Sequence, residues 1–424
     1  MSSRDDVAID LTRYQEINES YLKKLSGDKV LSFDVLDQDG KAVFSSGSRI
    51  SGDDIKKHTS SGKRFFIPRT FESTGSFTHE IVDKKKMNDL VEDTAYVYGE
   101  IRRTGEMDYE QYLRSNAQLT SIVDGLKTED KTGGVISLLR DIIDFDHYTY
   151  THSVNVGILA MILAFKEMSS SDTVKTYALA GYLHDIGKLR IDPAIIQKPG
   201  LLSPEEYYRV MEHTREGYRI LDSVENPAGE KMVPNVIKLT ALFHHRKFQS
   251  PGYPFRTMPK DKSREAAYNE LPEAARIIGI CDMYEAISSS APYRKPQQPA
   301  SALRYILNLS NYLYSIDDVY RFLKAVSLSL NRGQPFLSQG DFVMVESVKV
   351  SLDTRKKQRI YEIARIEDIT RSNFLMPKVQ IFYDVVRRKK IKPINVDLRY
   401  DTARKIVRVF ESNRIKEMMR QQLK

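Results

Sequence analysis

Histidines are concentrated in one part of this 424-residue chain. Five of the eight lie between residues 152 and 245, which is less than a quarter of the sequence. One of them belongs to the segment Leu183-His184-Asp185-Ile186-Gly187-Lys188, where an apolar helical run that begins at Tyr177 gives way to a glycine turn. A histidine and an aspartate at such a helix end are often only solvated residues. The clustering of the other histidines instead indicates one metal site, around which the rest of the chain must fold.

Five predicted helices carry the candidate ligands, each at or near a helix end or an apolar stripe. The clearest helix start is Ser203-Pro204-Glu205-Glu206, with an N-cap serine, a proline at the first helical position and a glutamate placed for a capping box. The candidates are His152, His184, Asp185, His213, His244, His245 and Asp282. Any one of them alone is more often a buried core histidine or a surface residue. Together they indicate a metal centre built inside a helical bundle.

Five neutral imidazoles and two carboxylates are too many ligands for one tetrahedral ion with an open position, but they suit two ions that share a carboxylate. The predicted sets are His152, His184, Asp185 and Asp282 for one ion, and Asp185, His213, His244 and His245 for the other. Two divalent cations and two carboxylates leave a charge of about +2, which suits phosphate oxygens. A water that bridges metals about 3.5 to 4 Å apart would then lose a proton and attack phosphorus in line. Phosphate ester hydrolysis is the predicted chemistry.

Lys188 is the second predicted catalytic residue, besides the bridging Asp185. It follows that aspartate by three residues. We therefore expect its ammonium group to contact a non-bridging oxygen or the leaving group of the substrate as a point charge. A solvated lysine beyond a glycine turn is the weaker alternative, which stays open at the level of the sequence.

The remaining composition is that of a soluble globular protein with two or three domains, since 41% of the residues are hydrophobic and 29% are charged. The longest apolar run, Val156 to Phe165, is about half of what a bilayer span requires, so no transmembrane helix is expected. The single cysteine, Cys281, and an N-terminus without a signal sequence predict a cytoplasmic protein. The net charge of +8 is diffuse over this length, and no nucleic-acid partner is expected.

The predicted architecture is mainly α-helical and has four segments. Residues 1–82 are expected to form a small regulatory α+β module, with a polar helix to about residue 28 and a hairpin from Val30 to Phe44 around Asp39-Gly40. Residues 83–146 have the pattern of a helical connector, and residues 147–332 that of the helical catalytic domain. Residues 333–424 contain three strand-like runs before a basic helix, which predicts a small β-rich module.

The strand-rich end modules are typical of parts of a protein that bind other proteins. A homodimer and a signalling-protein partner are therefore both open alternatives. The run Arg387-Arg388-Lys389-Lys390 in the last module is the most strongly charged stretch there. We interpret it as a solvated hairpin tip, with an anion contact as the weaker alternative.

The motifs resemble those of the HD-GYP family of cyclic dinucleotide phosphodiesterases, a branch of the HD metal-dependent phosphohydrolases. The likeness covers about residues 145–330. It rests on His152-Ser153, His184 to Lys188, Lys198 to Glu206, His213, His244-His245, Gly252-Tyr253-Pro254, Asp282 and Pro292-Tyr293. The resemblance implies an HD-type helical bundle that hydrolyses cyclic di-GMP to pGpG or onward to GMP, with iron or manganese at the two sites. It also implies that Gly252, Tyr253 and Pro254 shape the substrate pocket, with Tyr253 stacking on guanine or contacting phosphate.

Several positions depart from the family pattern. Arg246 stands where a glutamate usually follows the paired histidines, and Gln249-Ser250-Pro251 replaces the usual Asp-Gly-Ser. Members with three metals carry a glutamate at the position of Tyr148, so two metals are favoured here. The metal-ligand set is complete, whereas the substrate-contacting set is altered.

The remaining departure concerns the phosphates of the substrate. The arginine usually found before Pro292-Tyr293 is Ala291 here, which leaves Arg294 and Lys295 as the expected phosphate contacts. A cyclic di-GMP phosphodiesterase is the leading prediction. A phosphohydrolase for another cyclic dinucleotide, such as cyclic GMP-AMP, and a non-catalytic cyclic di-GMP-binding signalling adaptor are the alternatives.

Overall fold

The computed structural model describes most of the chain beyond residue 84 and five short segments before it. The described residues are 14–17, 35–38, 42–44, 51–59, 64–68, 84–128, 148–167, 170–196, 198, 200–250, 252–254, 263–289, 297–331, 335–350, 357–370 and 372–423. The chain divides into two compact units, Met1–Thr78 and His79–Lys424. The predicted mainly helical fold class, with a strand-rich C-terminal part, is confirmed. The division into four functional domains stays a prediction.

The first unit contains a four-stranded antiparallel sheet in the order β1-β4-β2-β3. Its elements are β1 (Tyr14–Ile17), β2 (Val35–Asp37), β3 (Ala42–Phe44), α2 (Gly52–Thr59) and β4 (Phe65–Pro68). The predicted hairpin is confirmed for its described part, because β2 and β3 are antiparallel and Val35 pairs with Phe44; residues 30–34 and the Asp39-Gly40 turn lie outside the described residues. The helix predicted over residues 1–28 is wrong at Tyr14–Ile17, which pair with β4 as a strand, and the rest of that prediction lies outside the described residues. Cross-strand pairing overrides the helical spacing of the sequence here.

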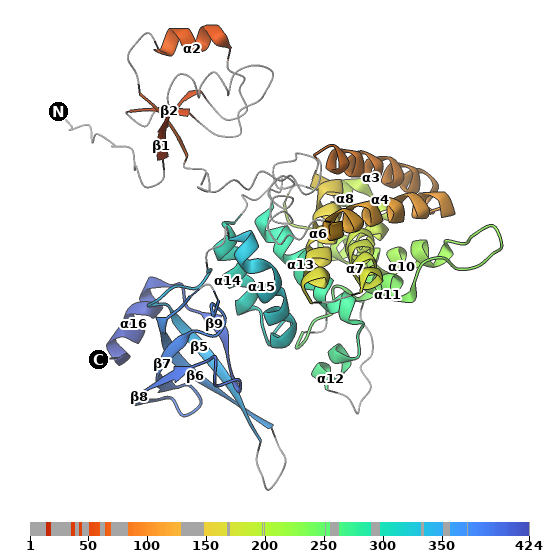
Figure 1. Ribbon diagram of the computed structural model, residues 1–424. Coiled ribbons are helices and arrows are strands. Elements are labelled where there is room, and N and C mark those ends of the chain that lie inside the picture. Colours follow the sequence, from red (N-terminus) through yellow and green to blue (C-terminus); the bar gives the residue numbers. More distant parts are fainter. Residues whose placement is uncertain are drawn as a thin grey trace. The chain divides into compact units, whose positions relative to one another are not determined.

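Helices build the first part of the second unit (Figure 1). They are α3 (Lys84–Thr104), α4 (Tyr109–Thr128), α6 (Tyr148–Glu167), α7 (Ser171–Leu183), the 3-10 helix η1 (Ile186–Arg190), α8 (Pro193–Ile196), α9 (Pro204–Met211), α10 (His213–Ser223), α11 (Asn235–Phe243), α12 (Arg264–Asn269), α13 (Glu273–Ser288), α14 (Pro299–Asn308) and α15 (Ile316–Leu330). The helix start predicted at Ser203 is confirmed, since Ser203 and Glu206 form a complete capping box at the beginning of α9.

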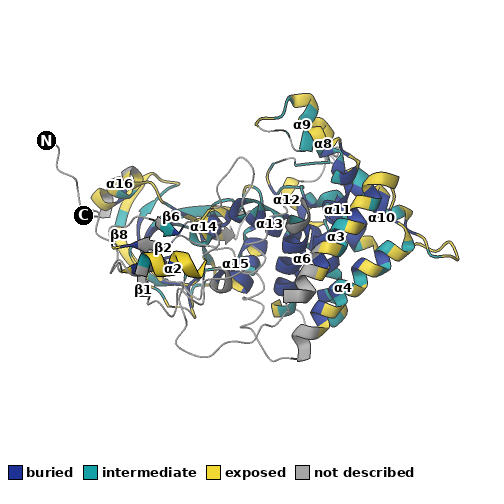
Figure 2. Ribbon diagram, turned by 90° about the horizontal axis from the view of Figure 1, so that it is seen from above, coloured by how far each residue is buried: buried dark blue, intermediate teal, exposed yellow. Residues whose placement is uncertain are grey.

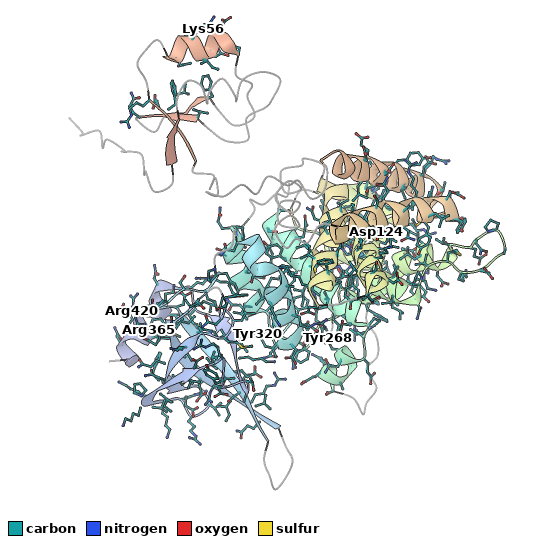
Figure 3. All side chains as sticks on the ribbon, in the orientation of Figure 1. Lys56, Asp124, Tyr268, Tyr320, Arg365 and Arg420 are labelled. Atoms are coloured by element: carbon teal, nitrogen blue, oxygen red, sulfur yellow. The ribbon has the colours of Figure 1, made fainter. Side chains whose placement is uncertain are left out.

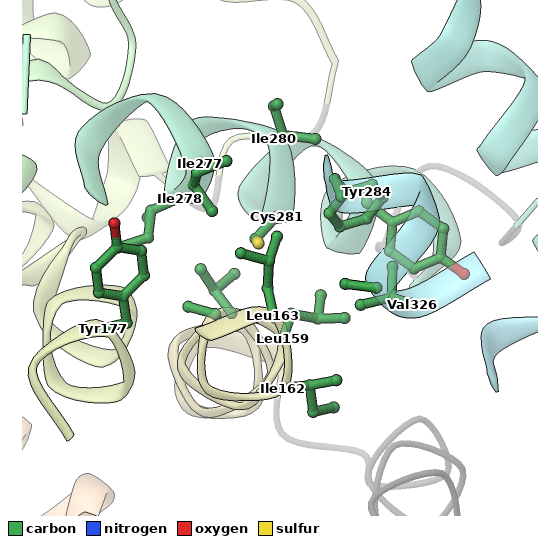
Figure 4. Packing of buried hydrophobic residues seen from close by; sticks show 14 of the residues in the cluster. Leu159, Ile162, Leu163, Tyr177, Ile277, Ile278, Ile280, Cys281, Tyr284 and Val326 are labelled. Atoms are coloured by element: carbon green, nitrogen blue, oxygen red, sulfur yellow. The ribbon is translucent and has the colours of Figure 1, made fainter. Parts of the chain in front are cut away.

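Helix α6 is the central element of the core. Every residue from Ser153 to Ala164 is buried (Figure 2). Figure 4 shows side chains of α6, among them Leu159 and Leu163, packed against side chains of α13, among them Ile278 and Cys281. A helix that is apolar on all sides belongs in a core, so the longest apolar run of the sequence is a core helix. In the described part of the chain no helix is long and apolar enough to cross a membrane.

Helices α3 and α4, from the segment predicted as a connector, pack onto the bundle. Tyr98 Oη of α3 donates to the Tyr182 carbonyl of α7 (2.9 Å), and Tyr182 Oη donates to Thr94 Oγ1 (2.9 Å). Apolar side chains of both helices belong to the same core as those of α6 and α7. Residues 84–128 are therefore an integral part of the helical unit, and they support the helix that ends at His184.

A five-stranded antiparallel sheet follows the helices, in the order β8-β7-β6-β5-β9. Its elements are β5 (Phe342–Val350), β6 (Lys357–Asp368), β7 (Lys378–Asp384), β8 (Lys389–Asp397), β9 (Arg404–Val409) and the terminal helix α16 (Asn413–Leu423). Phe342, Phe382 and Met419 form a small core between the sheet and α16. The tip of the β7–β8 hairpin, which carries Arg387 and Arg388, is exposed as expected.

The edge strand β9 is fastened to helices α14 and α15. Val409 N donates to Asn308 Oδ1 (2.8 Å), and Asn308 Nδ2 donates to the Val409 carbonyl (3.3 Å). The hydroxyl of Tyr320, which is labelled in Figure 3, accepts a hydrogen bond from Ile406 N (2.7 Å), and Ser310 Oγ donates to a further carbonyl of β9 (3.1 Å). These side chains form hydrogen bonds with backbone groups of β9. Without them, the same groups of this edge strand could pair with a strand of another chain.

Candidate metal centre

The structure brings all seven predicted ligands together in the helical unit. They form two groups, one of Asp185, His213, His244 and His245, and one of His152, His184 and Asp282. Within each group, one nitrogen or carboxylate oxygen from every residue lies within 4.8 Å of those of the others. The groups coincide with the two ligand sets assigned from the sequence, except that Asp185 counts in only one of them. That these residues hold metal ions stays a prediction.

Asp185 lies between the two groups. Its Oδ1 atom is 3.2 Å from His213 Nε2 and 3.7 Å from His244 Nε2. Its Oδ2 atom is 3.4 Å from His152 Nε2 and 3.4 Å from His184 Nε2. Each oxygen of this carboxylate therefore faces one group, which is the arrangement that a bridging carboxylate requires.

Helix ends place the ligands. His184 follows the last residue of α7 and Asp185 precedes η1, while His213 begins α10 and His244 follows the last residue of α11. Gly187 allows η1 to approach α10, because a Cβ atom at this position would lie 1.9 Å from the His213 carbonyl oxygen. Only glycine fits there, so Gly187 sets the separation of Asp185 and His213.

Backbone carbonyls fix the orientation of three imidazoles. His184 Nδ1 donates to the Gly181 carbonyl (2.7 Å), His213 Nδ1 to the Val210 carbonyl (2.6 Å) and His244 Nδ1 to the Ala241 carbonyl (3.0 Å). A carbonyl can only accept, so the proton of each ring is on Nδ1. The lone pair of each ring is then on Nε2, which faces the centre, as in histidines that bind metals.

His152 is oriented by a carboxylate that the sequence reasoning did not single out. Its Nδ1 atom contacts Glu285 Oε2, and Glu285 Oε1 accepts hydrogen bonds from Asn155 Nδ2 (2.9 Å) and Ser289 Oγ (2.6 Å). Glu285 lies three residues after Asp282 on α13, so both point to the same side of that helix. This spacing is the signal in the sequence that could have identified it.

The protonation states of His244, His245 and Asp185 suit a metal ion. Burial lowers the pKa of His244 to about 4 and holds that of His245 well below its usual value, so both rings are neutral at pH 7. Burial alone would raise the pKa of Asp185, but neighbouring groups, above all the positive charge of Lys188, hold that pKa well below the usual range. An ionised carboxylate and neutral imidazoles are the forms that bind metals.

Two polar atoms of the centre lack a partner. His184 Nε2 and Asp185 Oδ1 are buried and make no hydrogen bond within the part of the chain that the structure describes. Buried polar atoms are almost always paired, and a cation would complete the coordination of both. The donor set therefore fits the predicted ions.

Lys188 contacts Asp185 Oδ2 through its ammonium group, and 32% of its side chain is exposed. Its side chain therefore connects the buried carboxylate with solvent. This geometry agrees with the predicted contact to substrate, although a role in catalysis stays a prediction.

The Gly252-Tyr253-Pro254 loop packs directly on the ligands. The Tyr253 ring lies 4.4 Å from the His245 ring, with an angle of 34° between the planes. Gly252 has a φ of +55°, and a Cβ atom there would lie 2.3 Å from the His245 carbonyl oxygen, so the position requires glycine. Arg246, one of the departures from the family pattern, donates through Nη1 to the Pro254 carbonyl (3.1 Å). Ala291, Arg294 and Lys295 lie outside the described residues.

The chain just beyond the paired histidines is bonded to the segment before α15. Phe248 N donates to the Leu313 carbonyl (2.9 Å), and Gln249 N donates to the Tyr312 carbonyl (2.9 Å). These bonds hold the start of the Gly252-Tyr253-Pro254 loop against the helical unit.

Comparison with known proteins agrees with the motifs. Residues 138–315 match the HD domain family. A cyclic di-GMP phosphodiesterase from Thermotoga maritima is 34% identical over 201 residues, which cover 46% of this chain and 50% of that protein. Cyclic di-GMP phosphodiesterase PA4108 from Pseudomonas aeruginosa is 29% identical over 265 residues, 62% of this chain and 55% of that one. A 3'3'-cGAMP-specific phosphodiesterase 1 from Vibrio cholerae is 29% identical over 161 residues, 38% of this chain and 34% of that one.

The chain matches about half of the length of the first two relatives and about a third of the third. The match to the HD domain family and the similarity to these phosphodiesterases confirm the resemblance to HD-GYP proteins that the motifs predict. All seven candidate ligands lie within residues 138–315.

Proposed function

We propose that this protein is a metal-dependent phosphodiesterase that hydrolyses a cyclic dinucleotide, with cyclic di-GMP as the substrate and pGpG, GMP or both as products. One observation carries the proposal. The Asp185 carboxylate faces one ligand group with each of its oxygens, and all seven predicted ligands are brought together, four of them buried and three partly buried. Relatives named as cyclic di-GMP phosphodiesterases support the choice of substrate.

Two divalent cations, for which iron or manganese is proposed from the family resemblance, supply when bound the Lewis acidity that activates water and the positive charge that holds phosphate oxygens. The residues of the chain hold the ions and contact the substrate. Asp185 spaces the two ligand groups, and burial keeps the rings of His244 and His245 unprotonated. Lys188 offers a positive charge to the phosphate or the leaving group.

A second candidate substrate is cyclic GMP-AMP. Relatives from Vibrio cholerae are named as specific for 3'3'-cGAMP, and two positions around the predicted substrate site, Arg246 and Ala291, depart from the family pattern. Arg246 bonds the Pro254 carbonyl, so the loop that carries Tyr253 is held by a residue that most family members lack. A cytoplasmic location, and a homodimer or a signalling-protein partner, remain predictions beside this proposal.

A product assay tests the proposal. Protein loaded with iron or manganese is incubated with cyclic di-GMP and, separately, with 3'3'-cGAMP, and the nucleotides are separated by chromatography. We expect conversion of cyclic di-GMP to pGpG or GMP, and loss of this conversion in the Asp185→Ala variant. The matched control is Asp172→Ala, which removes an exposed aspartate from the first turn of α7 and should leave turnover unchanged.

Each other outcome points to a different function. Faster turnover of 3'3'-cGAMP than of cyclic di-GMP would assign the second substrate. Tight binding of cyclic di-GMP without products, in protein that contains two metal ions for each chain, would favour the adaptor. No binding and no turnover of either nucleotide would rule out the proposed function.

A further inference from the structure

Helix α9 presents aromatic side chains to solvent close to the metal centre. Tyr207 is 49% exposed and Tyr208 is 60% exposed, while Leu201 in the preceding loop is 94% exposed. Single exposed apolar residues are common on protein surfaces. This group differs because one of its members contacts the Gly252-Tyr253-Pro254 loop.

That member is Tyr207, which is the outermost ring of a series that begins at the metal ligands. The Tyr253 ring packs on His245 at 4.4 Å and stands 6.0 Å from the His213 ring. The Tyr207 ring stands 6.4 Å from the Tyr253 ring, with an angle of 84° between the planes. His245 covers part of the Tyr253 ring, whereas half of the Tyr207 side chain remains open to solvent. Among the aromatic rings of this series, Tyr207 therefore has the most surface to offer a ligand.

The backbone under Tyr207 is held in place. Ser203 N donates to Glu206 Oε2 (2.7 Å), and Glu206 N donates to Ser203 Oγ (3.2 Å), so the first turn of α9 is capped from both sides. Lys198 Nζ also donates to the Glu206 carboxylate (2.6 Å). A contact residue on such a fixed helix loses little conformational freedom when it binds a ligand, which favours affinity.

We propose that Tyr207 is a positioning residue that stacks on a nucleobase of the cyclic dinucleotide. The inference rests on the proposed function, because it needs the phosphodiester at the metal centre. A nucleotide whose phosphate lies at the ligands must direct its bases outward, and in the part of the chain that the structure describes Tyr207 is an exposed aromatic ring next to Tyr253. Stacking on an aromatic ring accepts any base, since every base has a π-face. Tyr207 would therefore serve guanine and adenine alike and contribute affinity rather than base selectivity.

A fluorescence experiment tests this contact directly. The chain contains no tryptophan, so the Tyr207→Trp variant carries a single indole at the proposed position. Stacking of guanine on the indole should quench its emission in a saturable way when a phosphorothioate analogue of cyclic di-GMP is added to the metal-loaded protein. The matched control is Tyr208→Trp, because the next residue of a helix points about 100° away. Its emission should not change.

Affinity and kinetics provide the second measurement. Loss of one base–aromatic stack should weaken binding of the analogue about 5- to 100-fold in Tyr207→Ala, and should raise KM for cyclic di-GMP while kcat is kept. Tyr207→Phe should bind like the wild type, because it retains the ring. Tyr208→Ala should also bind like the wild type, and metal content measured by elemental analysis should be the same in all four proteins.

The outcomes separate this inference from the proposed function. Wild-type affinity in Tyr207→Ala, or an indole at position 207 that is not quenched, would overturn the stacking role while cyclic dinucleotide hydrolysis stands. An equal loss in Tyr207→Phe would assign the effect to the hydroxyl group and overturn stacking as well. Wild-type protein that binds neither the analogue nor cyclic di-GMP would overturn both proposals.

Discussion

The metal centre and the surface around it are built in different ways. His184, His213 and His244 are fully buried, and each is fixed by a helix end and a backbone carbonyl. The surrounding surface consists of a half-exposed helix face with Tyr207 and a loop that Arg246 holds through one carbonyl. The core packing of the domain determines the first region and leaves the second free to vary. In the proposed enzyme, the metal chemistry and the contacts with the rest of the substrate would therefore be carried by separate parts of the molecule.

The largest effect is expected from removing the residue that joins the two ligand groups. Asp185→Ala should lower turnover at least about 1000-fold, since a metal centre supplies several kcal/mol of transition-state stabilisation and each 1.36 kcal/mol is tenfold in rate. It should also reduce the content of both ions, whereas His213→Ala, which affects one group, should retain part of the metal. Elemental analysis and turnover are the measurements. An Asp185→Ala protein with two ions for each chain would contradict the bridging arrangement.

The second largest effect is expected at Gly187, whose close packing sets the distance between Asp185 and His213. Gly187→Ala would place a methyl group 1.9 Å from the His213 carbonyl oxygen, so η1 and α10 must separate. We expect a loss of about 3 kcal/mol in the free energy of unfolding, at the upper end of overpacking effects, together with reduced metal content. Urea unfolding provides the measurement. The matched control, Gly99→Ala, has an open position in the middle of α3 and should stabilise the protein slightly. Equal stability of the two variants would show that the close contact does not matter.

Glu285→Gln should have an intermediate effect, mainly on the metal affinity of one of the two ligand groups. The change removes the charge that orients His152 through Nδ1. We expect metal affinity at the group of His152, His184 and Asp282 to fall about 10- to 100-fold, with a smaller change at the other group. Competition with a chelator measures both affinities, and Glu417→Gln on the surface of α16 serves as the control. An equal loss at both groups would mean that Glu285 supports the whole centre.

The smallest effect is expected at the surface around the centre. Arg246→Ala removes a hydrogen bond to the Pro254 carbonyl, and a typical bond of this kind would raise KM about 2- to 10-fold. Metal content and kcat should stay at the wild-type level if the two regions are independent. A marked loss of metal in this variant would show that the loop also supports the ligands, and the contrast between centre and surface would fail.

The same contrast explains how much could be read from the sequence. The ligands lie at helix ends or on apolar helices, whose caps and spacing are local signals, so His152 to Asp282 could be predicted as one centre, although nothing yet tests that they bind metal. The buried run of α6 and the hairpin of β2 and β3 are local patterns too. The spacing of Glu285 from Asp282 is visible in the sequence, but its contact with His152 depends on the proximity of α6 to α13. The strand at Tyr14–Ile17 depends on pairing with β4, and the contact of Tyr207 with Tyr253 depends on tertiary packing, none of which is a local property.

The bonds between β9 and the helices have a consequence for any shortened form of this protein. The side chains of Asn308, Ser310 and Tyr320 form hydrogen bonds with backbone groups of β9. Within the same stretch, the carbonyls of Tyr312 and Leu313 accept hydrogen bonds from the chain that follows the paired histidines. A protein cut after residue 331 would leave the polar side chains of this stretch without the strand they bind. The C-terminal sheet therefore cannot be treated as a detachable appendage, since its removal would disturb the stretch that holds the start of the Gly252-Tyr253-Pro254 loop.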